Sequence, residues 1–172
     1  MTNAFTKEFI DQSIYRIEEN THRILKCLQE IDEVETWQAP NEKSNSIGNL
    51  ILHLCGNIRQ YAISALGEKK DTRDRPKEFS IKEGPGKESL FDELVNTVAE
   101  AISILKNIDE ARLTKIYSVQ GFSLSGIGII IHVTEHYSYH TGQIAFWTKQ
   151  LKNKDLGFYA NIDLNVKNSI NT

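Results

Sequence analysis

The chain has 172 residues, of which 40% are hydrophobic and 25% are charged, a composition that is typical of a globular domain and excludes a disordered chain. A chain of this length can bury one sizeable core, so we expect a single domain over residues 1–172. Lys and Arg total 20 against 23 for Asp and Glu, and the formal net charge of -3 provides no general positive field for nucleic-acid binding.

Helical periodicity dominates the first part of the chain. Apolar side chains recur at spacings of three, four and seven residues between Phe5 and Ile31, which predicts a first helix. After a turn-rich connection, Ser46 is the expected N-cap of a second helix that ends before Gly67. Residues 68–86 lack a core-forming period and contain two of the three prolines, so we expect a long crossover there.

Two further helices follow the crossover. Ser89 and Asp92 form an acidic variant of a capping box, which opens a third helix with apolar positions as far as Leu105. Ser123 is the expected cap of a fourth and longest helix, which extends to Leu151. The predicted fold class is therefore all-α, a four-helix bundle with a long crossover between helices 2 and 3 that lets the middle two helices lie parallel.

Cysteine usage and hydropathy indicate the compartment. Cys27 and Cys55 are too few for a disulfide framework, and we interpret both as small core residues. The amino terminus lacks the pattern of a signal peptide, and the longest apolar stretch, near residues 127–133, is far shorter than the roughly 20 residues of a membrane span. We therefore expect a cytoplasmic protein that does not cross a membrane.

Three of the five histidines, His132, His136 and His140, lie four residues apart on the predicted fourth helix. Side chains at positions i and i+4 project from one helix face with Cβ atoms about 5–6 Å apart, so two imidazoles there can bind one metal ion. The spacing alone does not decide between the two adjacent pairs. His22 lies among charged neighbours on the first helix, and we interpret it as a solvated surface residue.

A third ligand is expected from another helix, because a catalytic metal site typically has three protein ligands and one open position. His53 lies in the apolar segment LILHLCGN of the predicted second helix, where an unpaired imidazole would be costly to bury. A hydrogen-bonded core histidine is the competing interpretation. Asn57 and Gln143 lie one turn from His53 and His140, so they are candidates to orient a ligand or face a substrate, although solvent-facing amides are an equal alternative.

The charged crossover offers a second, weaker candidate for binding. It could present Arg73 and Arg75 to an anionic substrate, although a run of charges is more often a solvated surface with internal pairing. The sequence contains no GxxxxGK[ST], GxSxG or CxxC motif, which excludes a phosphate-binding loop, a serine-hydrolase elbow and a thioredoxin-type redox pair. Metal chemistry is therefore the leading hypothesis.

Two segments resemble a known family. The stretch HVTEHYSYHTGQI, residues 132–144, resembles the fourth-helix signature of the DinB-like (YfiT-like) superfamily of metal-binding four-helix bundles. The stretch SNSIGNLILHLCGN, residues 44–57, resembles the second-helix segment that supplies the remaining histidine. Trp37 and the DRPKEF stretch, residues 74–79, resemble an uncharacterised bacterial branch of that superfamily.

The resemblance implies a ligand set and a chemistry. Carried over by position, the metal ligands fall on His53, His136 and His140, with Gln143 beside them, whereas His132 matches a frequent extra histidine that is not normally a ligand. Relatives include transferases and isomerases in which the metal activates bacillithiol or mycothiol, and they often form homodimers. The resemblance thus implies a low-molecular-weight thiol as a further cofactor, a small-molecule substrate and a homodimer. Imidazole ligands suit zinc or nickel as the metal, and the sequence does not choose between the two.

The function expected from these residues is that of a metal-dependent transferase or hydrolase. Three neutral imidazoles would leave the double charge of the ion available to activate a thiol or a water molecule. The alternative is a non-catalytic, metal-stabilised or stress-related binding protein, in which the ion contributes folding energy.

Overall fold

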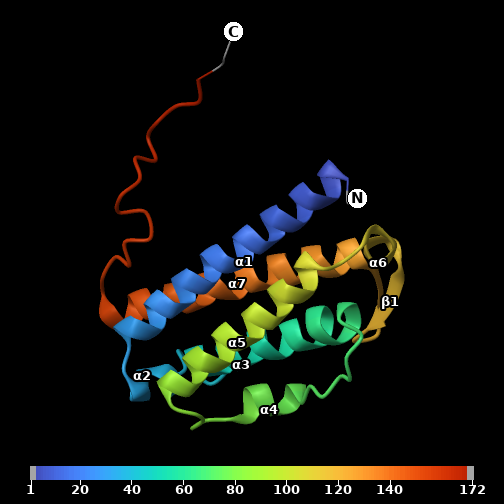
Figure 1. Ribbon diagram of the computed structural model, residues 1–172. Helices are drawn as coiled ribbons and strands as arrows, with labels where there is room; N and C mark the ends of the chain where they lie inside the picture. The colour runs from blue at the N-terminus through green and yellow to red at the C-terminus, as the bar shows by residue number, and fades with distance from the viewer. Residues whose placement is uncertain (1–2, 170–172) are drawn as a thin grey trace.

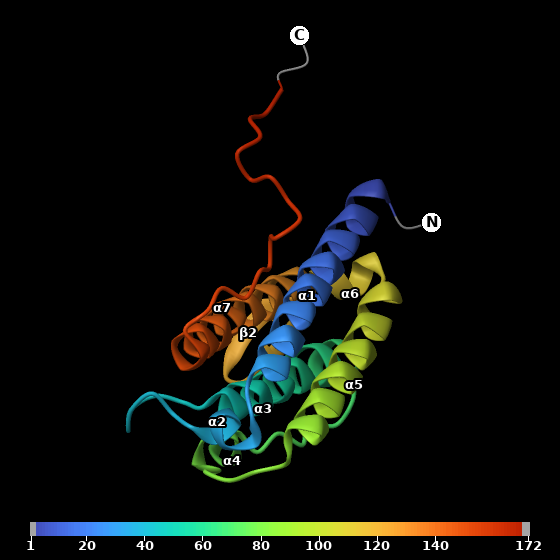
Figure 2. The same ribbon diagram turned by 90° about the vertical axis from the view of Figure 1, so that its left-hand side faces the viewer.

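The computed structural model describes residues 3–169 and contains a bundle of four long helices (Figures 1 and 2). The long helices are α1 (Ala4–Glu30), α3 (Ile47–Ile58) with its π-helical continuation η1 (Arg59–Leu66), α5 (Lys87–Lys106) and α7 (Gly126–Lys152). The short elements are α2 (Glu33–Trp37), α4 (Arg75–Ser80), α6 (Glu110–Thr114) and an antiparallel hairpin of β1 (Ile116–Val119) and β2 (Phe122–Ser125). The predicted helical bundle is confirmed, with one small sheet added to it.

The four long helices form a closed ring of neighbours. Helix α1 packs against α5 and α7, and α3 packs against the same two helices. Helices α3 and α5 run in one direction, and α1 and α7 run in the opposite direction (Figure 1). Residues 67–86 return along α3 and carry α4 on the outside of the bundle (Figure 1), as the predicted crossover requires.

The inward faces of these helices supply the core. Burial of each large aliphatic side chain contributes about 1.5–3 kcal/mol to the stability of the fold. The regular spacing of apolar residues along each helix therefore stabilises the packed bundle. The buried aliphatic residues include Ile10, Ile14, Ile17, Ile24, Leu28, Leu50, Ile51, Leu54, Ile58, Leu90, Leu94, Leu105, Ile129, Val133 and Ile144. Among residues 3–169, no helix combines the length and the apolar character needed to span a lipid bilayer.

Ser46 caps the start of α3, as predicted, and forms a capping box with Asn49. The Ser46 side chain accepts a hydrogen bond from the backbone N–H of Asn49, and the Asn49 side chain accepts one from the backbone N–H of Ser46. Asn49 also donates to the backbone oxygens of Glu78, at 2.9 Å, and Ile81, at 2.8 Å. One side chain therefore both begins α3 and holds α4 against it.

The predicted caps of the other two helices are wrong. Helix α5 begins at Lys87 rather than at Ser89, because the Glu33 carboxylate accepts from the Lys87 backbone N–H at 3.0 Å and caps the helix from outside. Helix α7 is capped by Ser125, whose hydroxyl accepts from a backbone N–H at 3.1 Å. Ser123 lies in β2 and pairs with the opposite strand.

The hairpin replaces part of the connection expected before the fourth helix. Val119 pairs with Phe122, and the two residues between them, Gln120 and Gly121, have φ angles of 51° and 83°. Positive φ at both positions is the requirement of a type I′ turn, which explains the glycine. The hairpin places Gln120 where its side-chain oxygen accepts from the Tyr61 hydroxyl at 2.8 Å.

Trp37 ties the end of the crossover to α3. A Cβ atom at Gly48 would lie 2.7 Å from the indole ring, and a Cβ at Gly84 would overlap it. The ring therefore fits between α3 and the crossover only because both positions are glycine. This packing accounts for Trp37 in structural terms.

Candidate metal centre

The structure brings His53, His136 and His140 together between α3 and α7. One ring nitrogen from each residue lies within 4.8 Å of the others. The Nε2 atoms of His53 and His136 are 3.1 Å apart, and the ring centroids of His136 and His140 are 4.5 Å apart. The two α7 histidines are one turn apart, as the sequence spacing predicts, and α3 supplies the third ring from the opposite side.

The geometry and protonation of this cluster fit a metal ion. Two nitrogens bound to one tetrahedral zinc at about 2.0–2.1 Å would be about 3.3 Å apart, close to the His53–His136 separation. Burial and the neighbouring histidines lower the pKa of His136 to about 3, and burial also lowers the pKa of His140. Both rings are therefore neutral at pH 7 and offer free lone pairs.

Glu78 fixes the orientation of His53. Its Oε2 atom lies 2.8 Å from His53 Nδ1, and both side chains are buried. With Nδ1–H donating to the carboxylate, the His53 Nε2 lone pair points toward His136. Metal-bound histidines almost always have such a partner, which sets the tautomer and raises the basicity of the ligand.

Arg73 in turn holds Glu78. Its Nε donates to Glu78 Oε1 at 2.7 Å, its Nη2 to Oε2 at 2.9 Å, and its Nη1 to Gln60 at 2.9 Å. Burial alone would raise the pKa of Glu78, but hydrogen bonds from Arg73 and His53 outweigh it and hold the pKa below its usual value. Arg73 thus belongs to an internal ion pair and not to an exposed anion site, and Arg75 lies over the Phe79 ring at 5.0 Å.

Gly56 leaves the space that Glu78 occupies. A Cβ atom at this position would overlap Glu78 Oε1 and lie 3.0 Å from Arg73 Nε. The Glu78 carboxylate reaches His53 because Gly56, one turn after His53 on α3, has no side chain to block it.

The remaining predicted site residues surround the cluster. Asn57 Nδ2 donates to His132 Nε2 at 3.2 Å, and the Tyr61 ring stacks on His132 with centroids 4.2 Å apart. The His132 Nε2 lone pair therefore already has a donor, and its role as a neighbour rather than a ligand stays a prediction. Gln143 Oε1 lies 2.7 Å from His140 Nδ1, which leaves His140 Nε2 free for an ion.

Two buried polar atoms beside the cluster have no partner among residues 3–169, namely Asn57 Oδ1 and His136 Nδ1. An unpaired buried polar atom costs about 1–3 kcal/mol. Such atoms at the edge of the histidine cluster indicate a place for a bound polar group.

A family model for a protein of unknown function, DUF1572, matches residues 4–161 and so includes every residue of this cluster. The chain belongs to the DUF1572 family. No curated protein sequence matches it.

Several solved structures have the same fold as this DUF1572 protein. A DinB-like protein from Bacillus cereus superimposes with a TM-score of 0.67 at 16% identity, over 84% of this chain and 91% of that one. A DinB-like protein from Bacillus subtilis gives 0.65 at 16% identity, over 84% and 94%. A conserved protein from Enterococcus faecalis gives 0.65 at 20% identity, over 90% and 99%. The resemblance to DinB-like proteins is thus confirmed for the fold.

Sequence reasoning missed Glu78 as a partner of the site in this DUF1572 protein. Its only signal was its place in the DRPKEF stretch, which has no periodicity and lies 25 residues from His53 along the chain. The carboxylate becomes relevant only when the crossover folds back onto α3.

The two cysteines are core residues, as predicted. Burial raises the pKa of Cys55 to about 12 and that of Cys27 to about 11. Thiols with such pKa values are inert at neutral pH, because the thiolate is the reactive form. Neither cysteine of this DUF1572 protein can serve as a nucleophile.

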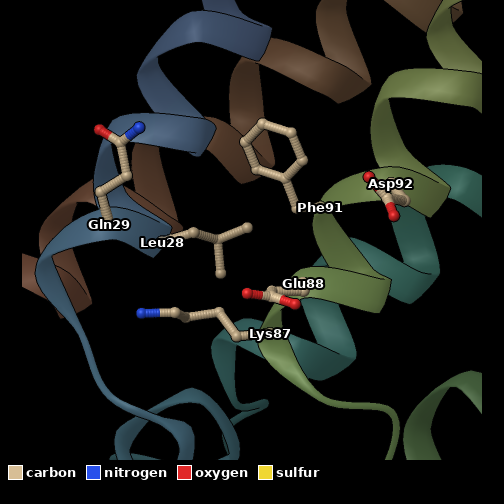
Figure 3. A pocket seen from close by; sticks show the side chains of 6 residues that line it. All are labelled: Leu28, Gln29, Lys87, Glu88, Phe91 and Asp92. Atoms are coloured by element: carbon tan, nitrogen blue, oxygen red, sulfur yellow. The ribbon is translucent and has the colours of Figure 1, made fainter.

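A separate hollow of about 470 Å³ lies between the end of α1 and the start of α5 (Figure 3). Its lining residues are Leu28, Gln29, Lys87, Glu88, Phe91 and Asp92. Lys87 Nζ donates to the backbone oxygen of Ile31 at 2.7 Å, so the cation there serves to cap α1. This hollow contains no histidine and is not part of the candidate metal centre.

Proposed function

We propose that His53, His136 and His140 bind one divalent transition metal, and that the protein is a metal-dependent transferase or hydrolase. The observation that carries this proposal is the convergence of three ring nitrogens within 4.8 Å, one of them oriented by a buried carboxylate. Imidazole ligands suit zinc and nickel. When bound, such an ion acts as a Lewis acid that lowers the pKa of a thiol or water molecule toward neutrality.

The residues around the cluster support this chemistry. Glu78 and Gln143 hold the rings of His53 and His140, so neither has to reorient when the ion binds. Asn57 Oδ1 is buried beside the cluster and has no partner among residues 3–169. Both cysteines are inert, so a thiol nucleophile would come from outside the chain, and water is the other candidate.

Activity is tested by incubating the metal-loaded protein with low-molecular-weight thiols, each paired with an electrophile such as 1-chloro-2,4-dinitrobenzene, and separately with activated esters. We expect turnover that a chelator abolishes and that zinc or nickel restores. His136→Ala should lose it, whereas His22→Ala, on an exposed position of α1, should retain it. Full metal content without turnover on any pair would favour the non-catalytic, metal-stabilised alternative.

A further inference from the structure

A hollow of about 590 Å³ lies beside the candidate metal centre, between α3, α7 and the loop before α3. Small-molecule sites typically have volumes of about 300–1,000 Å³. The lining residues are Pro40, Asn41, Lys43, Ser44, Asn45, Leu50, Tyr139, Gly142, Gln143, Phe146 and Trp147.

This hollow adjoins the histidine cluster through two of its lining residues, Gln143 and Tyr139. Gln143 lines the hollow and also contacts His140, with Oε1 2.7 Å from Nδ1. The Tyr139 ring lies 5.0 Å from the His140 ring in an edge-on arrangement. Phe146 follows His140 by six residues, which is about 9 Å along the helix at about 1.5 Å per residue. A small molecule in the hollow would therefore contact Gln143, the side chain that holds His140.

The walls of the hollow are aromatic. Tyr139 and Phe146 are 63% and 64% exposed, which is unusual for large rings on one helix face. The Trp147 indole N–H donates to the Gln38 backbone oxygen at 2.9 Å, which fixes the ring. Leu50, 4% exposed, adds a buried apolar surface. Aromatic rings gathered in one hollow favour a flat ligand that stacks on them.

The opposite side of the hollow is polar and carries one positive charge. Lys43 is the only charged side chain among the lining residues. Asn41 Oδ1 accepts from the Lys43 backbone N–H at 2.9 Å and from the Ser44 hydroxyl at 3.1 Å, so the loop that carries the cation is held in place. A single cation in a polar wall favours an anionic group on the ligand.

We propose that this hollow binds the substrate, and that the substrate is a small anionic molecule with a flat aromatic or conjugated body, such as an aromatic carboxylic acid. Its body stacks on Phe146 and Trp147, its anionic group lies near Lys43, and its reactive end extends past Gln143 toward the histidines. The assignment as substrate rests on the proposed function of the metal centre, whereas the binding itself does not.

The test uses 1-naphthoate as an anionic probe and 1-naphthylmethanol as its neutral counterpart. Binding is measured by titration calorimetry and by the NMR shift of the Trp147 indole N–H, in the metal-loaded protein and in His136→Ala. We expect Phe146→Ala to weaken both probes about five- to tenfold, in line with the energy of one aromatic pair. Lys43→Gln should weaken only 1-naphthoate, and Phe5→Ala, an exposed ring on α1, should change neither.

The possible outcomes separate the two proposals. Absence of binding, equal affinity for both probes, or insensitivity to Phe146→Ala would overturn the inference even if the protein contains its metal. Binding that declines as protein concentration rises would show that a second copy covers the rings, and would overturn it too. If the wild-type protein shows the expected pattern of binding but takes up no metal, the binding site stands and its role as the substrate site of a metalloenzyme is refuted.

Discussion

At the level of single residues, the tightest steric requirement in the candidate metal centre is the one that Glu78 places on Gly56. A methyl group at this position would overlap Glu78 Oε1. Displacement of the carboxylate would remove the acceptor of His53 Nδ1 and leave the Arg73 guanidinium, 2% exposed, without its ion-pair partner.

We therefore predict that Gly56→Ala lowers metal affinity about 10- to 100-fold, the usual effect of losing the partner of a ligating histidine. Overpacking should also reduce the free energy of unfolding by about 1–3 kcal/mol. Chelator competition and urea denaturation measure the two effects. Gly142→Ala is the matched control on α7, because its Cβ would meet no atom within 4 Å, and it should keep its metal affinity. Wild-type affinity in Gly56→Ala would contradict the role assigned to Glu78.

The buried histidines also predict how the metal-free protein responds to acid. Burial and neighbouring histidines lower the pKa of His136 from the usual 6.5 to about 3, and burial lowers the pKa of His140. Between about pH 3 and pH 6.5 the unfolded chain binds more protons than the folded chain, so the free energy of unfolding rises with pH. This loss of stability is absent above about pH 6.5 and grows as the pH falls toward 3.

The chelator-treated protein should consequently melt at a lower temperature at pH 5.5 than at pH 7.5. The difference should be smaller in His136→Gln, and His22→Gln on α1 is the matched control. A melting temperature that does not change between the two pH values would show that the histidine cluster is open to water.

Local geometry predicted a shared helix face for the histidines of α7 but left two adjacent pairs open, and the choice of His136 with His140 came from the resemblance to DinB-like proteins. His136 and His140 share a helix face because they are four residues apart on one helix. His53 could be singled out because it is a polar residue within an apolar segment. Glu78 and Arg73 could not be predicted in the same way, because their contacts with His53 exist only after the crossover packs on α3.

At the level of elements, α4 and the crossover act as part of the site. Two hydrogen bonds from Asn49, to the backbone oxygens of Glu78 and Ile81, attach α4 to the start of α3. The position of the Glu78 carboxylate therefore depends on a side chain that also caps α3.

We predict that Asn49→Ala lowers the free energy of unfolding by about 1–3 kcal/mol, because it removes a cap and leaves two backbone oxygens with weaker partners. Amide hydrogen exchange should accelerate in α4 more than in α5. Asn107→Ala is the control, since Asn107 bonds only within its own helix end at an exposed position. Unchanged exchange in α4 would mean that other contacts suffice to hold it.

Helices were predictable and the hairpin was not, for a physical reason. The first helix was expected from Phe5 to Ile31 and spans Ala4–Glu30, because its apolar stripe repeats over many turns. Each strand of the hairpin has four residues, too few to display an alternation, and its turn is Gln120–Gly121 rather than the more common Asn–Gly. The start of α5 was misplaced because its cap comes from Glu33, a residue distant in sequence.

At the level of the whole molecule, this DUF1572 protein has the fold of two DinB-like proteins at 16% identity, so the likeness extends to architecture alone. We propose that it also forms a homodimer, as the sequence resemblance implies. Ile131, 51% exposed, lies in a shallow hollow between α1 and α7 that a second copy could cover.

Sedimentation equilibrium should then give twice the chain mass of 19.6 kDa, and Ile131→Glu should shift the protein toward the monomer. Ile116→Glu, on the exposed edge of the hairpin, is a control of similar exposure. A monomer at all concentrations would refute this proposal and leave the metal centre unaffected, because its histidines come from one chain.

The metal centre is tested most directly by elemental analysis of untagged protein purified without added metal. We predict about one transition-metal ion per chain, most of it lost in His136→Ala and retained in His22→Ala. Near-complete occupancy in His136→Ala would contradict the three-histidine site. So would a wild-type protein that contains no transition metal and takes up none when zinc or nickel is supplied.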